Sequence, residues 1–378
     1  MLQETARQFA EAELKPKSFE MDEKESFNEA AFHKMGDLGV LGITVPVEEG
    51  GAGMDAVAAT IAMEEFGRHD ASTALSYLAH TILFTHNLSR HGSEEQKKKY
   101  LPKVCSGEWI AGMAITEPEA GSDALGMQSF AEKKGNKWIL NGSKIWITNS
   151  TIGNVFFVYA KTDKTGDPKK DLSSFIVEKS FPGFRAGKKF SKMGMRGSPT
   201  GELIFENCEI PEENLVGGYP GVACQKMMRN LEIERVTIAG ISNGIALQAV
   251  EEMTKYATER KQFGKELGSF QMIQKMIADS IANTSAAREL VFSAAKQIDL
   301  AGDETRLDSL AAEAKLVAAQ NATQVGLDAI QVLGGYGYSR EFPVERYMRD
   351  AKLNEIGAGT NEVLRMIIAK TALKKYRS

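Results

Sequence analysis

The sequence predicts an α+β fold in three parts: an N-terminal all-α domain (residues 1–110), a middle β-barrel or sandwich domain (111–218) and a C-terminal four-helix bundle (219–378). Three observations lead to this expectation. The 378 residues are too many for one ordinary core. Apolar residues recur at helical spacing in both end regions, whereas they alternate at strand spacing in the middle. Strand and helix patterns do not alternate along the chain, so a doubly wound dinucleotide-binding sheet is not expected.

The elements can be placed in order. The N-terminal region reads as helices, broken at "EEGGAG" (48–53) and resumed in "VAATIAMEEFGRH" (57–69). In "NKWILNGSKIWITNS" (136–150), two alternating segments flank Asn141-Gly142, which predicts a hairpin. Further strands are expected in "VFFVYAKT", "SSFIVEK" and "GELIFENCEI". From Gly221 the helical period returns, and it predicts helices over 222–258, 269–300 and 304–333, a short one from about 344 and a last one from Thr360.

Composition argues against several classes of function. A net charge of −4 gives no basic footprint for nucleic acid, and no apolar run reaches the roughly 18 residues of a membrane span. The cysteines Cys105, Cys208 and Cys224 lie far apart, which indicates a reducing compartment. The histidines lie in the first quarter of the chain without metal-ligand spacing, so no metal site is expected. The N-terminal "MLQETARQFAEAELKP" is acidic enough to be an amphipathic helix rather than a transit peptide.

One predicted helix carries a carboxylate on its apolar face. The residues that form this stripe are Met227, Leu231, Glu234, Ile238, Ile241, Ile245 and Gln248. Burial of Glu234 among aliphatic side chains would raise its pKa toward the range that a general base needs near neutral pH. Glu232 interrupts a second stripe, through Val236, Asn243 and Val250. For either glutamate the alternative is a buried ion pair, with Arg235 or Arg229, and periodicity does not choose between the two carboxylates.

Three further segments could carry chemistry. "MAITEPEAGSDALG" (113–126) exposes backbone N–H groups that could cradle a phosphate or a polar heterocycle, or it joins two domains. "QVLGGYGYSREFPVERYMRD" (331–350) gathers Arg340, Glu345, Arg346, Arg349 and Asp350, either as an ion-pair network or beside glycines that admit a flat ligand. Its "GGYGYSR" lacks the third glycine of a nicotinamide site and follows a helix. "KLNEIGAGTNEVLR" (352–365) opens the last helix with a Gly-Ala-Gly-Thr turn.

Together these segments resemble the acyl-CoA dehydrogenase family over essentially the whole chain. The stretches "GVLGITVPVEEGGAGM", "KMGMRGSPTGELIFENCEIP", "LEIERVTIAG" and "DAKLNEIGAGTNEV" look most like the isovaleryl-CoA dehydrogenases within it. The resemblance implies an FAD-dependent enzyme of leucine catabolism that converts isovaleryl-CoA to 3-methylcrotonyl-CoA. Alternatives are the same reaction on another straight, 2-methyl-branched or larger acyl-CoA, or a catalytically silent binding subunit, which Ala358 in the turn suggests.

The resemblance also assigns catalytic roles. That subgroup carries its base on the bundle helix and has Ala in the Gly-Thr turn. Its Leu-x-x-Glu-Arg pattern matches Leu231, Glu234 and Arg235, and so favours Glu234 over Glu232. Glu234 would take the α-proton while the β-hydrogen leaves as hydride to flavin N5. The Ala358 N–H and a flavin ribityl hydroxyl would hold the thioester oxygen.

Binding residues follow from the same resemblance. The flavin contacts implied within one chain are Met113, Ile115, Thr116, Gly121, Ser122, Trp146, Thr148, Thr360 and Glu362. A neighbouring subunit would supply Arg260, Phe263, Gln271, Gln331 and Gly335 to the pyrophosphate and adenosine half, which implies a homotetramer or dimer of dimers. Substrate contacts are expected at Leu75, Ala79, Ser122, Leu231, Arg235, Ile238, Asn354 and Gly359.

Three expectations concern the surroundings of the reaction. Asn354 departs from the subgroup, which usually has Tyr there, so the acyl pocket is expected to be longer or more polar. Electron-transfer flavoprotein would reoxidise the flavin. The compartment would be the bacterial cytoplasm, or the mitochondrial matrix in a eukaryote.

Overall fold

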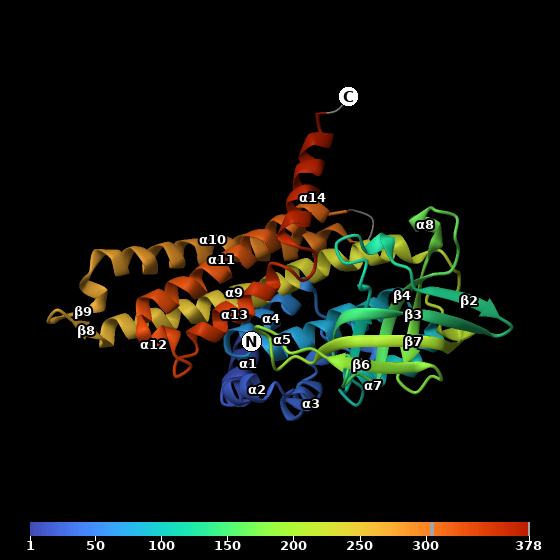
Figure 1. Ribbon diagram of the computed structural model, residues 1–378, viewed down its shortest axis with the longest axis horizontal. Helices are drawn as coiled ribbons and strands as arrows, with labels where there is room; N and C mark the ends of the chain where they lie inside the picture. Colours follow the sequence, from blue (N-terminus) through green and yellow to red (C-terminus); the bar gives the residue numbers. More distant parts are fainter. Residues whose placement is uncertain (303–305, 377–378) are drawn as a thin grey trace.

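The computed structural model describes residues 1–302 and 306–376. Helices form the first and last parts of the chain and strands the middle part, and the sheet lies at one end of the molecule (Figure 1). The N-terminal helices are α1 (Leu2–Phe9), α2 (Ser18–Lys24), α3 (Glu29–Asp37), α4 (Ala56–His69), α5 (Ala71–Leu78), α6 (Asn87–His91) and α7 (Glu94–Cys105). Wider π-helical turns, Ala10–Leu14 and Ala79–His86, continue α1 and α5. The predicted break at 48–53 is confirmed as a turn in which Gly50 has a φ of +90°. The helix predicted over 57–69 is α4.

The middle region is one sheet. Its strands are β1 (Ala111–Ala114), β2 (Phe130–Lys134), β3 (Lys137–Thr148), β4 (Val155–Lys161), β5 (Leu172–Glu178), β6 (Phe184–Lys189) and β7 (Thr200–Pro211). The order is β1-β4-β2-β3-β7-β6, and β5 pairs with β4. A short helix, α8 (Pro168–Asp171), precedes β5. Trp138, Leu140, Phe175 and Phe205 pack in a core of this sheet that is separate from the main core of the protein.

The hairpin predicted at Asn141-Gly142 is wrong. β3 runs unbroken through both residues, and the tight turn of this region is at Gly135, where β2 turns back into β3. At Asn141 and Gly142 the pairing of β3 with β7 shifts register, and Gly142 has a φ of +142°. The Asn141 side chain accepts a hydrogen bond from Asn207 N at 2.8 Å, across the two strands. The Asn-Gly pair therefore forms a bulge rather than a turn.

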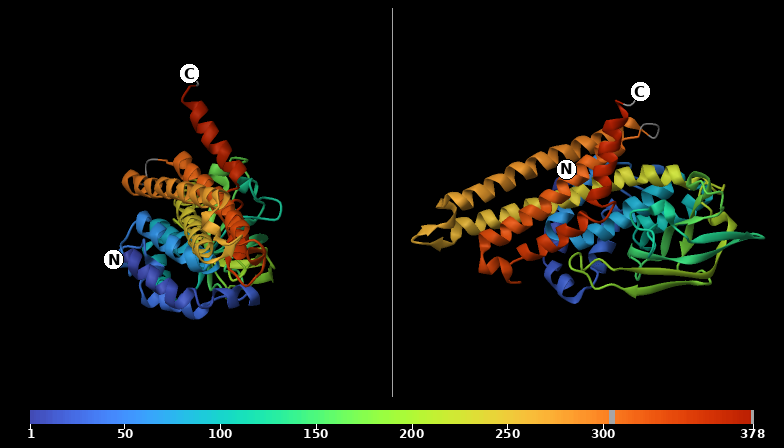
Figure 2. Two further views of the ribbon diagram at one scale, coloured as in Figure 1. Left: turned by 90° about the vertical axis from the view of Figure 1, so that its left-hand side faces the viewer. Right: turned by 45° about the horizontal axis from the view of Figure 1, so that its top comes forward.

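The C-terminal region consists of long helices. They are α9 (Ala223–Glu259), α10 (Gln271–Ala301), α11 (Asp308–Leu333), α12 (Gly335–Tyr338), α13 (Val344–Asn354) and α14 (Asn361–Lys374), with a small β8 (Lys261–Gln262) and β9 (Lys265–Glu266) hairpin after α9. These bounds confirm the predicted helices to within a few residues, although residues 304–305 of the predicted 304–333 helix lie outside the described part. α14 projects away from the other helices and ends near the C-terminus (Figure 2).

Helix α9 is the central helix of the protein, because α4, α10 and α11 all pack on it. Glycines allow α4 to approach closely. A methyl group at Gly244 would lie 2.2 Å from the Glu64 carbonyl oxygen, and one at Gly240 would lie 2.9 Å from that of Thr60. The middle of α9 is thereby enclosed by both helical regions, which buries whatever side chains it carries there. Within the described residues, no helix is long and apolar enough to cross a membrane.

Candidate active site

Glu234 lies in the enclosed part of α9. It is 8% exposed, and its Oε2 has no hydrogen-bond partner among the residues that the structure describes. Burial raises the pKa of Glu234 to about 7, against the opposing charges of Arg235 and Lys315. A carboxylate without a fixed partner, half-protonated near neutral pH, has the properties of a general base.

Glu232 is held in a different way, although it lies only two residues away. Its carboxylate is fully buried, forms ion pairs with Arg229 and Arg306, and accepts a hydrogen bond from Leu307 N at 3.2 Å. The buried ion pair that the sequence left open for both glutamates therefore exists at Glu232. Its pairing occupies both carboxylate oxygens, whereas Glu234 keeps a free one.

Arg235 keeps unused hydrogen-bond donors. It is 5% exposed and lies 3.7 Å from Asp308 at its closest atom, yet its Nε and Nη1 make no hydrogen bond within the described chain. A buried guanidinium with free donors suits an anionic ligand. Leu231, one turn earlier, is half-buried in the same region of α9.

The Gly-Ala-Gly-Thr turn has a left-handed backbone. Ala358 has a φ of +55° and Gly359 a φ of +90°, and Asn361 N closes the turn by donating to Glu355 O at 2.9 Å. Thr360 begins α14 by accepting a hydrogen bond from Val363 N. In the described part of the chain the Ala358 N–H donates to nothing. Ala358 is half-buried, so its N–H, which has no acceptor within the described residues, is available as a donor to a ligand.

The two carboxylates beside that turn have other partners. Glu355 pairs with Lys352 at 3.2 Å and accepts a hydrogen bond from Asn361. The Glu362 side chain is 78% exposed and lies 3.4 Å from Arg365. Neither has the burial that raises the pKa of Glu234.

The 113–122 segment follows β1 and is fixed from behind by a buried ion pair. Lys144 of β3, fully buried, donates to the Ile115 carbonyl at 2.9 Å and to Glu117 at 2.7 Å. Glu117 in turn accepts from Ser129 N at 2.9 Å. Met113 and Ile115 are buried, Thr116 is half-buried, and Gly121 and Ser122 lie exposed at the tip. Sequence patterns did not single out Lys144. The available signal was a lysine at a position where the alternation of the strand predicts an inward-facing side chain.

The end of β3 presents an aromatic ring to solvent. Trp146 has a φ of +62°, is 59% exposed and lies 4.7 Å from Phe190 between ring centroids. Thr148 pairs with Thr200 where the strand ends. Next to it, Asn149 donates to Ser76 O at 3.0 Å and to Ala111 O at 2.9 Å. These bonds join the end of β3 to β1 and α5. Ile145 N also donates to Thr116 O at 2.9 Å, so the residue before Trp146 is bonded directly to the 113–122 segment.

The predicted acyl positions are buried. Leu75, Ala79 and Ile238 are at most 7% exposed, and Asn354 is fully buried at the end of α13. Asn354 Nδ2 donates to Ser242 Oγ at 2.9 Å, while its Oδ1 has no described partner. Ser242 lies one helical turn beyond Ile238 on α9, so Asn354 brings a polar group next to the aliphatic stripe.

A cleft of about 610 Å³ lies at the far end of the bundle. It brings together three of the predicted adenosine-half residues, Arg260, Gln331 and Gly335. A methyl group at Gly335 would meet nothing within 4 Å. Phe263, 92% exposed, lies at the tip of the β8–β9 hairpin, and Gln271 begins α10; neither lines the cleft. At 1.5 Å per helical residue, the cleft is roughly 40 Å along α9 from Glu234.

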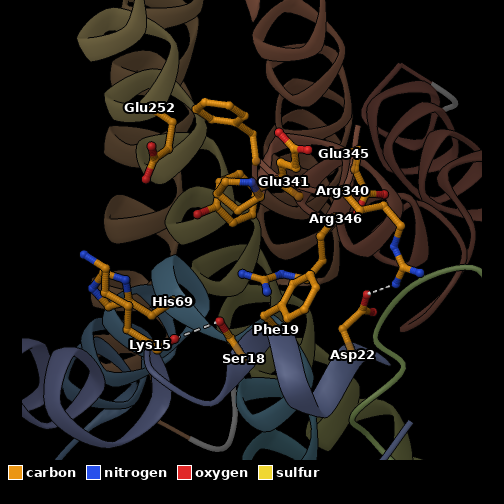
Figure 3. Close-up of a pocket in the computed structure, with 13 residues that line it drawn as sticks. Lys15, Ser18, Phe19, Asp22, His69, Glu252, Arg340, Glu341, Glu345 and Arg346 are labelled. Atoms are coloured by element: carbon orange, nitrogen blue, oxygen red, sulfur yellow. Dashed lines mark hydrogen bonds and ion pairs between the residues drawn. The ribbon is translucent and has the colours of Figure 1, made fainter. Parts of the chain in front are cut away.

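A second hollow, of about 390 Å³, contains none of the predicted site residues (Figure 3). Asp22 of α2 reaches Arg340 there at 3.5 Å (Figure 3). Arg349, which does not line the hollow, pairs with Asp22 at 2.7 Å and with Glu345 at 2.6 Å. The ion-pair network considered for residues 331–350 is thus present, and it ties α13 to the N-terminal helices. Within residues 1–302 and 306–376, no three His, Cys, Asp or Glu side chains are grouped to hold a metal.

Comparisons with known proteins agree along the whole chain. Family models for the N-terminal, middle and C-terminal domains of acyl-CoA dehydrogenase match residues 1–108, 112–208 and 224–373. Mitochondrial isovaleryl-CoA dehydrogenase of Pongo abelii is 45% identical over 98% of this chain and 87% of its own. Butyryl-CoA dehydrogenase from Megasphaera elsdenii, a solved structure, is 36% identical with a TM-score of 0.94, covering 98% and 97% of the two chains. A chain from a structure described as the electron-transferring flavoprotein of Acidaminococcus fermentans is 40% identical with a TM-score of 0.95, covering 99% and 97%.

Proposed function

The chain belongs to the acyl-CoA dehydrogenase family of FAD-dependent oxidoreductases, and from this premise we propose that it oxidises isovaleryl-CoA to 3-methylcrotonyl-CoA with Glu234 as the general base. The observation that carries the proposal is the buried Glu234, with a free oxygen and a pKa of about 7. The identity to isovaleryl-CoA dehydrogenase supports the choice of substrate. Glu232, Glu355 and Glu362 are each engaged elsewhere, whereas Glu234 could supply the base that Ala358 cannot, which argues against a catalytically silent protein.

The residues of this chain would act on the thioester in three ways. Glu234 takes the α-proton, which is too weakly acidic to leave unaided at neutral pH. The Ala358 N–H donates to the thioester oxygen, where negative charge develops; a donor of this kind is worth about 2.7–4 kcal/mol in acyl-transfer sites. Arg235, with its free donors, holds the anionic part of the ligand. Enclosure by α4 and α9 excludes water, which strengthens the hydrogen bond from Ala358 and the charge interaction of Arg235.

The residues present fit the cofactor. Trp146 offers an exposed ring for stacking, Thr116 and Thr148 offer hydroxyls, and the 113–122 segment has an open tip at Gly121 and Ser122. When bound, FAD accepts the hydrogen that leaves the β-carbon with its electron pair. The cleft with Arg260, Gln331 and Gly335 would hold the adenosine half of a neighbouring chain's cofactor. Because the cleft lies roughly 40 Å from Glu234, one chain would contribute to two cofactors, which supports an oligomer; the family resemblance favours a homotetramer.

Two expectations about the surroundings rest on the family. We expect electron-transfer flavoprotein to reoxidise the cofactor, and the similarity to a chain from the Acidaminococcus fermentans structure supports this partner. The compartment would be the mitochondrial matrix or the bacterial cytoplasm.

A straight short-chain substrate is the second candidate. Asn354 raises this alternative, because it stands where the isovaleryl-CoA dehydrogenases usually have Tyr, and so changes the size and polarity of the acyl pocket. The likeness to butyryl-CoA dehydrogenase points the same way. Anaerobic addition of isovaleryl-CoA, butyryl-CoA and 2-methylbutyryl-CoA to the purified flavoprotein separates the candidates by which thioester bleaches the flavin absorbance fastest. No bleaching with any acyl-CoA would leave only the silent binding subunit.

The first prediction tests the base. Glu234→Gln should bind acyl-CoA but reduce the rate of bleaching by roughly 10²–10⁴-fold, the usual contribution of a general base. Glu232→Gln, two residues away and equally buried, is the matched control: it breaks ion pairs and should lower stability while its folded fraction still bleaches. Stopped-flow absorbance measures both rates. Wild-type bleaching by Glu234→Gln would refute the assignment.

A further inference from the structure

Lys315 is a fully buried lysine that has no role in the site as described so far. It lies on α11, which packs along α9 and also contacts α14. Its Nζ donates to the Gly359 carbonyl at 2.8 Å and lies 3.5 Å from Asn361 Oδ1. A buried ammonium is costly unless it is hydrogen-bonded and balanced by opposite charge, so its partners indicate what its charge does.

The hydrogen bond fixes the backbone of the turn. Gly359 follows Ala358, and both have positive φ, a conformation that an alanine adopts only when its surroundings enforce it. Lys315 holds the second of these residues from outside the turn, while the Asn361 N to Glu355 O bond closes it from within. Lys315 therefore restrains the left-handed turn to which the Ala358 N–H belongs.

The charge acts on Glu234. The charges that act on the pKa of Glu234 are those of Arg235, on its own helix, and Lys315, on α11, and both lower it; the charge of Glu234 in turn raises the pKa of the buried Tyr159 hydroxyl on β4. Lys315 in turn lies in the field of Arg235, Glu355 and Glu362. Burial lowers the pKa of Lys315 to about 8, and Glu234 opposes this, so the lysine is mostly protonated at neutral pH.

We propose that Lys315 is a positioning residue that aligns the Ala358 N–H with the thioester oxygen and keeps Glu234 ionised as the base. The inference rests on the proposed function of Glu234 and extends it to a residue on another helix. In this role Lys315 acts through the Gly359 carbonyl and through its charge, not as a catalytic residue. It links the donor that stabilises the developing negative charge to the group that removes the proton.

Three variants separate the two roles. Lys315→Gln keeps a neutral hydrogen-bond donor, Lys315→Arg keeps the charge, and Lys315→Met removes both. Lys352→Met is the matched control, because Lys352 pairs with Glu355 beside the same turn but its side chain is 45% exposed. Flavin content and circular dichroism establish that each variant is folded and loaded.

The primary readout is proton removal itself. Each variant is incubated with isovaleryl-CoA or butyryl-CoA in D₂O, and mass spectrometry follows exchange of the α-hydrogens across pH 5.5–9. Exchange needs only that the α C–H bond breaks, the proton passes to Glu234 and a deuteron returns. In parallel, calorimetry measures the binding of the acyl-CoA.

Loss of the charge should move the acid limb of the exchange profile to higher pH. For Lys315→Gln and Lys315→Met we expect the acid limb to shift by about one pH unit, which lowers the exchange rate roughly tenfold at pH values below the limb. Lys315→Met should also lose rate at the plateau, because the turn is no longer held. Lys315→Arg and Lys352→Met should keep the wild-type limb, and acyl-CoA binding should change by less than about threefold throughout.

The outcomes distinguish failure of this inference from failure of the proposed function. If Glu234→Gln exchanges at the wild-type rate, Glu234 is not the base, whatever the Lys315 variants do. If Glu234→Gln is inactive but Lys315→Gln and Lys315→Met keep the wild-type limb, only the role of Lys315 is overturned. A uniform loss of rate at every pH, or a shift in Lys315→Arg equal to that in Lys315→Met, would assign Lys315 a structural role alone.

Discussion

At the scale of single residues, two glutamates on one helix show what a sequence pattern leaves open. Glu232 and Glu234 both interrupt apolar stripes, and both are buried. Their difference comes from their partners: Arg229, three residues away, and Arg306, far away in sequence, both pair with Glu232, and neither is paired with Glu234 in the described chain. Local periodicity describes a helix face but not the side chains that a distant segment brings to it, here the residues just before α11. The family resemblance favoured Glu234, and the contacts give the physical reason.

The same burial makes Glu234 a cost to the fold, which gives a second prediction. Its pKa is raised to about 7 in the folded protein, so the unfolded chain releases the proton first as pH rises from about 4.5. Stability is therefore lost between about pH 4.5 and 7, by up to about 3 kcal/mol. Glu234→Gln should unfold at a higher temperature than wild type at pH 8, with the gap closing toward pH 5.

Circular dichroism melts of the ligand-free flavoprotein at both pH values measure this effect. Glu232→Gln serves as the control with opposite sign, because losing its ion pairs should lower the unfolding temperature at pH 8. If Glu234→Gln melts like wild type at pH 8, the free enzyme keeps this carboxylate solvated or paired.

At the scale of elements, β3 shows why turn signals mislead inside a sheet. Asn141-Gly142 has the composition of a hairpin turn, but β7 pairs on both sides of it and keeps the strand continuous. Long helices were predicted to within a few residues because their apolar period repeats many times. A two-residue turn signal has no such redundancy, and pairing with a distant strand overrides it.

The third prediction concerns the buried lysine that β3 supplies. Burial lowers the pKa of Lys144 to about 8, and the carboxylate of Glu117 opposes this shift. The charged form of Lys144 therefore depends on Glu117. Lys144→Met leaves the Glu117 carboxylate buried and unpaired, so we expect a loss of about 3–5 kcal/mol in stability and weaker retention of FAD by the 113–122 segment. Thermal melts and the ratio of flavin to protein measure the two effects.

Lys137 provides the control on the same strand. It pairs with Glu209 at 2.7 Å, but both side chains are at least 40% exposed. Lys137→Met should change stability by less than about 1 kcal/mol and leave flavin content unchanged. Equal effects of the two substitutions would mean that the Lys144–Glu117 pair does not hold the loop.

At the scale of the whole molecule, the order of helical, β and helical regions was readable from the sequence, but the way they join was not. The junctions depend on ion pairs and close backbone contacts between residues hundreds of positions apart. A methyl group at Gly194, for example, would lie 2.3 Å from the Arg349 carbonyl oxygen. An ion-pair network was one of two interpretations of residues 331–350, yet its acidic partner in α2, Asp22, had no signal in the sequence.

The last prediction tests that junction. Arg349 Nη2 lies 2.7 Å from Asp22 Oδ2, and the exposed fractions of the two side chains are 14% and 5%. Burial alone would raise the pKa of Asp22, but the hydrogen bond and charge of Arg349 outweigh it and hold that pKa below its ordinary value. The pair therefore adds stability above the unfolded-state pKa of about 3.9, and this is lost as pH falls through the lower folded-state pKa.

Asp22→Asn should lower the unfolding temperature at pH 7, because it leaves Arg349 with Glu345 as its only carboxylate pair in the described chain, at a cost on the order of 3 kcal/mol. The difference from wild type should narrow below about pH 4, where protonation removes the same charge from the native protein. Arg365→Met is the matched control, since Arg365 and Glu362 are 49% and 78% exposed and lie 3.4 Å apart. It should change stability by less than about 1 kcal/mol. If the unfolding temperature of Asp22→Asn stays equally far below that of wild type down to pH 3, then packing at this junction, rather than charge, joins α2 to α13.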